Sequence, residues 1–133
     1  MVFLHYLSAV RLLRQVEEAK ARALYADVIE ALEAQCTDVD VDWPGNELNI
    51  VIQLSTDGDQ FVAITGRTSL PWHDDRSGLG GWKAVHIDNS YGTAKVIYDT
   101  TTPEGDPAGD MSLEPLADEV ASYVNGWRAE YGT

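Results

Sequence analysis

Two short clusters of histidine and aspartate contain the residues of this chain whose side chains could do chemistry. His73 is followed directly by Asp74 and Asp75, and His86 is separated from Asp88 by one residue. If residues 82–88 form a strand, His86 and Asp88 project from the same face, which is the geometry that two metal ligands or an acid–base pair need. His73, His86 and Asp88 are therefore candidate metal ligands, and metal-assisted hydrolysis is the chemistry they would support.

Other signs of catalysis are absent from the sequence. The chain has no CxxC, HExxH or G-x-S-x-G motif, so neither a recognised zinc site nor a nucleophile elbow is indicated. Its single cysteine, Cys36, follows a predicted helix without a neighbouring His or second Cys, which is typical of a structural thiol. We therefore expect no cofactor and favour a protein that is not an enzyme.

Three aspartates alternate with apolar residues in the segment TDVDVDW. The Asp-x-Asp-x-Asp spacing of Asp38, Asp40 and Asp42 suggests a calcium loop, but valines intervene, and the turn glycine and closing glutamate of such a loop are missing. A strand with three carboxylates on its solvent face explains the pattern better. These carboxylates either form a binding surface or protect an edge strand from aggregation.

The segment between Thr68 and Gly81 has no regular pattern. A stretch of this length without secondary structure is uncommon in a compact domain and is usually functional or disordered. It contains Trp72 and Arg76, residue types that are enriched at interface hot spots. We predict a partner-binding surface from this loop and the acidic row, comprising Trp72, His73, Asp74, Asp75, Arg76, Asp38, Asp40 and Asp42. Trp82, at the start of a predicted strand, is expected in the core instead.

The elements that position these residues follow from periodicity. Apolar residues recur at three- and four-residue steps over residues 3–35, which predicts one long helix, with a bend expected near residues 18–22. Alternating residues and turn signals then predict two hairpins, and a final helix begins near Asp110 or Ser112. The predicted fold is α+β: a single domain, residues 1–133, with an antiparallel four- to five-stranded meander covered by the two helices in two layers.

Charge limits the classes of partner. The chain has 22 acidic and nine basic residues, a formal net charge of −13. Because phosphate contacts need clusters of Lys and Arg, we expect no nucleic-acid partner. No apolar run reaches the roughly 20 residues of a membrane helix and no signal peptide is evident, so we expect no membrane partner and a cytoplasmic location. Such acidity suits a basic protein partner, although solubility or a salt-adapted source would also explain it.

Three hypotheses for the function follow. The first is a non-enzymatic, acidic protein-binding module of the inhibitor, immunity, antitoxin-like or chaperone type, which engages a more basic protein. The second is a small metal-dependent hydrolase or metal-binding protein that uses His73, His86 and Asp88. The third is a self-assembling structural subunit, viral or ring-forming, in which the N-terminal helix or an open sheet edge mediates homo-oligomerisation.

Overall fold

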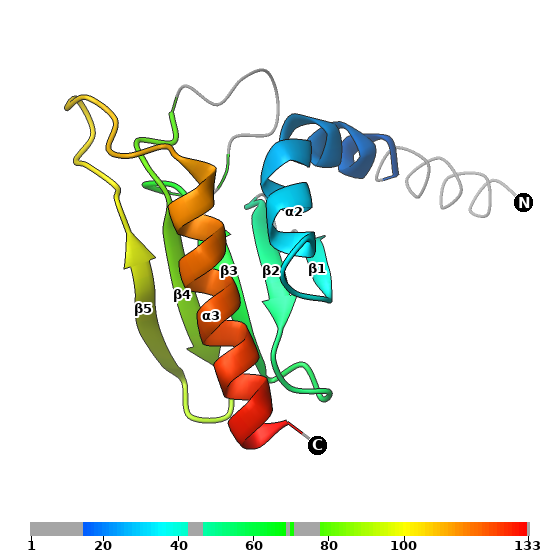
Figure 1. Ribbon diagram of the computed structural model, residues 1–133. Helices are drawn as coiled ribbons and strands as arrows, with labels where there is room; N and C mark the ends of the chain where they lie inside the picture. Colours follow the sequence, from blue (N-terminus) through cyan, green and yellow to red (C-terminus); the bar gives the residue numbers. More distant parts are fainter. Residues whose placement is uncertain (1–14, 43–46, 69, 71–77, 133) are drawn as a thin grey trace, which may run out of the picture.

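The protein is a single antiparallel sheet with helices packed on one face (Figure 1). The computed structural model describes residues 15–42, 47–68, 70 and 78–132 of the chain. Residues 15–24 are helical, and the elements that follow are α2 (Ala26–Glu33), β1 (Val39–Asp42), β2 (Asn49–Gln53), β3 (Gln60–Thr65), β4 (Lys83–Asp88), β5 (Thr93–Asp99) and α3 (Leu113–Tyr131).

The sheet is a meander in which each strand pairs antiparallel with its neighbour in the sequence. The spatial order is β1-β2-β3-β4-β5, and α2 and α3 lie against the same face of it (Figure 1). The predicted α+β meander with helices in a second layer is therefore confirmed, with five strands. None of the helices in the described residues has the length and apolar character needed to cross a bilayer.

The core lies between the sheet and the helices. Alternation places Ile50 of β2 beside Ile64 of β3 and Ala84 of β4 in one row across the sheet, and all three side chains are buried. The helices close this layer with fully or almost fully buried side chains: Val28, Leu32, Leu116, Val120 and Val124. Trp82 is completely buried, as predicted, and its indole Nε1 donates a hydrogen bond to the Met111 carbonyl at 3.1 Å.

The adjacent row of the sheet leads to the candidate site. Ile52 pairs with Val62, which pairs with His86. The first two side chains are buried and His86 is partly exposed. The alternation that fills the core thus turns His86 toward α3, at the edge of the packed layer.

The first helix changes direction at Tyr25. This residue has φ −112° and ψ 21°, outside the α-helical region, and it separates helical residues 15–24 from α2 (Figure 1). Beyond it, the backbone N–H of Val28 donates to the carboxylate of Asp27, so a side chain satisfies part of the new helix N-terminus. The predicted bend is therefore present but lies beyond residues 18–22, and residues 3–14 of the predicted helix lie outside the described residues.

The connector between β5 and α3, residues 100–112, is anchored by Arg67. Its guanidinium Nη2 donates to the Thr102 hydroxyl at 2.9 Å and to the Asp106 carbonyl at 2.7 Å. The Gly80 carbonyl also accepts from the backbone N–H groups of Thr102 and Gly109. A Cβ on Gly80 would lie 1.8 Å from the Arg67 Nε, so glycine is required for this close approach.

Cys36 is buried next to the end of α2. Its Sγ lies 3.2 Å from the Leu32 carbonyl and donates a hydrogen bond to it. Burial raises the pKa of the Cys36 thiol, an effect that the nearby positive charge of Arg128 partly opposes. The thiolate that a nucleophile requires is therefore disfavoured, in agreement with a structural role.

Candidate functional site

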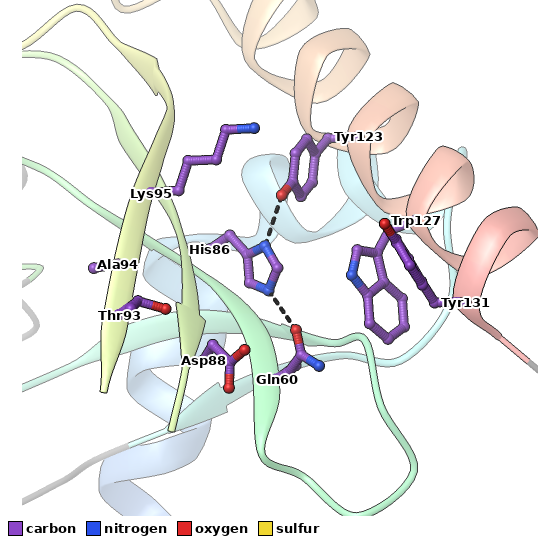
Figure 2. Close-up of a pocket in the computed structure, with 9 residues that line it drawn as sticks. All are labelled: Gln60, His86, Asp88, Thr93, Ala94, Lys95, Tyr123, Trp127 and Tyr131. Atoms are coloured by element: carbon purple, nitrogen blue, oxygen red, sulfur yellow. Dashed lines mark hydrogen bonds between the residues drawn. The ribbon is translucent and has the colours of Figure 1, made fainter. Parts of the chain in front are cut away.

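A cavity of about 400 Å³ opens beside His86, between the β4–β5 hairpin and α3. Its strand side is formed by Gln60 of β3, His86 and Asp88 of β4, and Lys95 of β5, and its helix side by three aromatic residues of α3 (Figure 2). We call it the His86 cavity. It combines aromatic walls with a few polar groups, the composition that is typical of ligand sites.

Both ring nitrogens of His86 are hydrogen-bonded. Nδ1 lies 2.6 Å from the Tyr123 hydroxyl oxygen, and Nε2 lies 3.0 Å from Oε1 of Gln60 (Figure 2). Since an amide oxygen only accepts, the Nε2–H donates to Gln60, which leaves Nδ1 to accept from the Tyr123 hydroxyl. This arrangement holds the neutral imidazole in its Nε2–H tautomer.

Electrostatics also favour the neutral form of His86. Burial lowers the pKa of His86 below its ordinary value, and the charge of Lys95 lowers it further, while Asp88 acts in the opposite direction. The pKa of Tyr123 is raised mainly by burial and further by the nearby hydroxyl of Tyr131, so the Tyr123 hydroxyl keeps the proton that it donates. With both nitrogens engaged, His86 is held as a structural hydrogen-bonding group and has no unshared nitrogen ready to act as a general base.

Three aromatic residues of α3 form a continuous row along the helix. Tyr123, Trp127 and Tyr131 follow one another at four-residue steps, so they share one helix face. The rings of Trp127 and Tyr131 are 5.3 Å apart between centroids, and the Trp127 ring stands edge-on to His86 at 6.4 Å. Lys95 Nζ lies 5.5 Å from the centroid of the Tyr123 ring, within cation–π range.

A second cavity, of about 760 Å³, lies on the other side of Trp127 and Tyr131. It extends over the β2–β3 turn, and both aromatic residues line it as well as the His86 cavity. We call it the turn cavity. Its charged lining residues are Asp38, Asp57 and Arg128.

The β2–β3 turn fixes the carboxylate of Asp57 in the turn cavity. Gly58 has φ +80°, which the predicted Asp-Gly turn requires. The Asp57 carboxylate accepts from the Ser55 hydroxyl at 2.6 Å and from the Asp59 N–H at 3.0 Å. The hydrogen bond from Ser55 lowers the pKa of Asp57 most, and the hydrogen bond from Asp59 lowers it further. This side chain is therefore ionised at neutral pH.

The predicted acidic row is divided between two environments. Asp40 and Asp42 lie in β1, but Asp38 precedes the strand with φ 63° and so does not share its alternation. Asp40 forms an ion pair with Arg22. Oδ2 of Asp38 lies 3.6 Å from Nη2 of Arg128. The side chains of Asp38 and Asp40 are still mostly exposed, at 70% and 60%.

The structure does not describe the remaining predicted site residues. Trp72, His73, Asp74, Asp75 and Arg76 lie outside the described residues. Their role in partner binding, together with that of the acidic row, therefore stays a prediction.

The metal hypothesis gains no support from the part of the chain that the structure describes. No group of three or more His, Cys, Asp or Glu side chains suited to a metal occurs there. His86 and Asp88 do line one cavity, as their spacing predicted. However, both His86 nitrogens are occupied by Tyr123 and Gln60, and the third candidate ligand, His73, lies outside the described residues.

The aromatic half of the His86 cavity was not predicted. The repeat of Tyr123, Trp127 and Tyr131 at four-residue steps is visible in the sequence, but Trp127 also continues the apolar spacing of Val120 and Val124, which is typical of a core face. Two tyrosines in line with it, near the end of a helix, are the signal that could have identified a separate aromatic face. The contribution of Gln60 could not be found from sequence, because it depends on the register of β3 against β4.

Comparisons of this chain with protein-family models, with curated proteins and with solved structures found no match.

Proposed function

We propose that this protein is a non-enzymatic, acidic binding module that engages a more basic protein, as an inhibitor, immunity, antitoxin-like or chaperone-type protein of the cytoplasm. The observation that carries this proposal is the uncompensated negative charge of its surface. The chain has 22 acidic residues against nine basic ones. No charged side chain is buried among the described residues, so their carboxylates face solvent or lie close to it.

Internal contacts occupy three of the arginines, so these guanidinium groups are not free to contact a partner. Arg67 is directed onto the connector. Arg128 donates to the backbone carbonyls of Thr37 and Gln53 at 3.1 and 2.6 Å. Arg22 is shared between Glu18 and Asp40. The net charge of −13 already includes these arginines, and a field of one sign accelerates association with a basic protein.

A capture experiment at two salt concentrations tests the proposal. The immobilised protein is exposed to native lysate of its source organism at about 50 mM and about 500 mM NaCl, since the Debye length shrinks from roughly 14 to 4 Å over this range. We expect a basic protein to be retained at low salt and released at high salt. Retention of no protein at low salt, or only of proteins whose binding is insensitive to salt, would contradict the proposal.

Two double variants with the same change in net charge test whether the carboxylates of β1 contribute to binding of the partner. Asp40→Asn with Asp42→Asn removes the carboxylates of the strand, whereas Glu30→Gln with Glu33→Gln removes two exposed charges from α2. If the acidic row binds the partner, the first pair weakens capture more than the second. Equal effects would show that only total charge matters and would remove β1 from the binding surface.

A second candidate, self-assembly, is favoured by the face of the sheet that α2 and α3 do not cover. One row across this face consists of Val51, Ala63, Val85 and Val96, paired in register. Val51 and Ala63 are buried and Val85 is partly exposed, whereas Val96 is 52% exposed, so the open part of this row is its β5 end. Apolar residues on an open sheet face suit contact with a second copy of the chain. Light scattering coupled to size exclusion at high protein concentration tests this, and a strictly monomeric result would exclude it.

A further inference from the structure

The His86 cavity and the turn cavity share a pair of aromatic rings from the C-terminal part of α3. Trp127 and Tyr131, which we call the aromatic ridge, line both the His86 cavity and the turn cavity. Tyr131 is 61% exposed, whereas Trp127 is partly buried against the core. Exposed aromatic rings that border a cavity are typical anchors of protein interfaces.

Carboxylates stand on both sides of the aromatic ridge. Asp88 lines the His86 cavity together with Gln60 and Trp127 (Figure 2). On the other side, Asp38 and Asp57 line the turn cavity. A group that rests against the ridge in either cavity therefore enters a cavity whose lining contains at least one carboxylate.

The two cations that line these cavities are already directed to internal partners. Lys95 lies over the Tyr123 ring, on the side of His86 away from Asp88 (Figure 2). Arg128 donates to the carbonyls of Thr37 and Gln53. With His86 neutral, the two linings together contain three carboxylates and two cations. The position of Lys95 over Tyr123, a ring of the same aromatic row, is a cation–π arrangement of the kind that an incoming guanidinium could adopt.

We propose that the aromatic ridge receives an arginine side chain of the basic partner, which stacks its guanidinium on Trp127 or Tyr131 and pairs with Asp88 or Asp57. This proposal rests on the proposed function and names its contact site. Arginine is favoured over lysine because its planar guanidinium is weakly hydrated, stacks on aromatic faces and binds carboxylates with two parallel hydrogen bonds. Charge complementarity with the surrounding acidic surface would bring a basic segment to this position.

A peptide titration followed by nuclear magnetic resonance tests the proposal on the whole chain. The probes are two synthetic peptides of six residues, one of arginine and one of lysine, which carry equal side-chain charge. We expect the arginine peptide to bind more tightly and to shift the indole signal of Trp127 and the ring signals of Tyr131. The indole signal is assigned by its loss in Trp127→Phe.

Matched variants distinguish the contribution of the aromatic ridge to peptide binding from that of the overall negative charge. Tyr131→Ser removes an exposed ring and should weaken binding of the arginine peptide by about three- to tenfold, the range of a cation–π contact at a partly exposed site. Tyr91→Ser removes a ring that is 84% exposed and lines neither cavity, and should leave binding unchanged. Asp88→Asn and Asp57→Asn should each weaken binding more than Glu104→Gln, which removes the same charge from the connector.

The outcomes distinguish this inference from the proposed function. Equal binding of the two peptides, equal effects of Tyr131→Ser and Tyr91→Ser, or shifts confined to other surfaces would overturn the arginine site. In each of these cases, salt-sensitive binding of basic peptides would still support an acidic binding module. Absence of binding to both peptides, together with failure to capture a basic protein from lysate, would overturn both proposals.

Discussion

His86 shows how one hydrogen-bonded residue can connect the sheet to the C-terminal helix. Its two nitrogens link Gln60 of β3 to Tyr123 of α3. The neutral ring satisfies both contacts, because Nε2–H donates and Nδ1 accepts. Protonation would place a proton on Nδ1 and force the Tyr123 hydroxyl to reverse its role, so the link is weaker in acid.

The first prediction concerns the pH dependence of stability that His86 causes. Its pKa is below the ordinary value of 6.5 in the folded protein. As the pH falls through 6.5, the unfolded chain therefore takes up a proton before the folded protein does. We expect the contribution of His86 to the free energy of unfolding to be complete above that pH and to be lost progressively down to its folded-state pKa.

Denaturant unfolding between about pH 8 and about pH 5 measures this effect. The free energy of unfolding of the wild type should fall relative to that of His86→Gln, which keeps a polar side chain but does not titrate. Parallel curves for the wild type and His86→Gln would refute the prediction.

At the scale of elements, the connector before α3 is ordered by contacts that are distant in the sequence. Arg67, which lies just after β3, reaches Thr102 and Asp106 across 35 and 39 residues. Thr100 adds a second anchor, since its hydroxyl accepts from the Trp82 N–H and donates to the Asp110 carbonyl. These contacts fix where α3 begins and thereby the position of its aromatic row.

The second prediction is that Arg67→Met loosens this connector. The variant loses hydrogen bonds from a charged group, and we expect the free energy of unfolding to fall by about 1–2 kcal/mol. The loss is limited because Arg67 Nε is buried without a hydrogen-bond partner in the wild type. Hydrogen exchange should accelerate at the Thr102 and Gly109 amides, which donate to Gly80.

Arg22→Met is the matched control for this prediction. It removes an arginine from a partly exposed pair with Glu18 and Asp40, where a loss of less than about 1 kcal/mol is expected. Exchange at Thr102 and Gly109 should not change in the control. Equal losses of stability in the two variants, with unchanged exchange in the connector, would contradict an anchoring role for Arg67.

The secondary structure was largely predictable because it is encoded locally. The alternation in β2 and β3 and the Asp57-Gly58 turn between them fix the strands and their faces. The Arg67 anchor was not predictable, because the same Pro-, Gly- and acid-rich connector sequence suits an unanchored segment. Likewise, the spacing of His86 and Asp88 predicted that they share one strand face, but the contact between His86 and Tyr123 depends on how α3 packs over the sheet.

For the whole molecule, the dominant property is repulsion among its own carboxylates. A formal net charge of −13 on a chain of 133 residues destabilises the compact state, because folding brings like charges closer together. The three arginines that form internal contacts offset this repulsion only locally. The surface that would attract a basic partner therefore also lowers the stability of the free protein.

The third prediction is that screening stabilises the protein. Raising NaCl from about 10 mM to about 500 mM shortens the Debye length from roughly 30 to 4 Å. It should raise the melting temperature by several degrees, which corresponds to about 1 kcal/mol for a domain of this size. A melting temperature that falls or stays constant would contradict the prediction.

A variant with less negative charge tests whether the effect of salt on the melting temperature comes from screening. Glu30→Gln with Glu33→Gln removes two charges and should raise the melting temperature at low salt while reducing its dependence on NaCl. Potassium chloride should act like sodium chloride, because screening depends on ionic strength and not on the identity of the cation.

The meander also determines the order in which the fold can assemble. Each strand pairs with its neighbour in the chain, and the longest connection between paired strands, from β3 to β4, spans residues 66–82. The helix contacts span much longer distances: Gln35 bonds Asp118, and Arg128 bonds Thr37, across 83 and 91 residues. Closing such long loops costs more entropy, so we expect α3 to dock after the hairpins have formed. Substitutions at Gln35 or Arg128 should then accelerate unfolding and leave the folding rate nearly unchanged, which stopped-flow kinetics would measure.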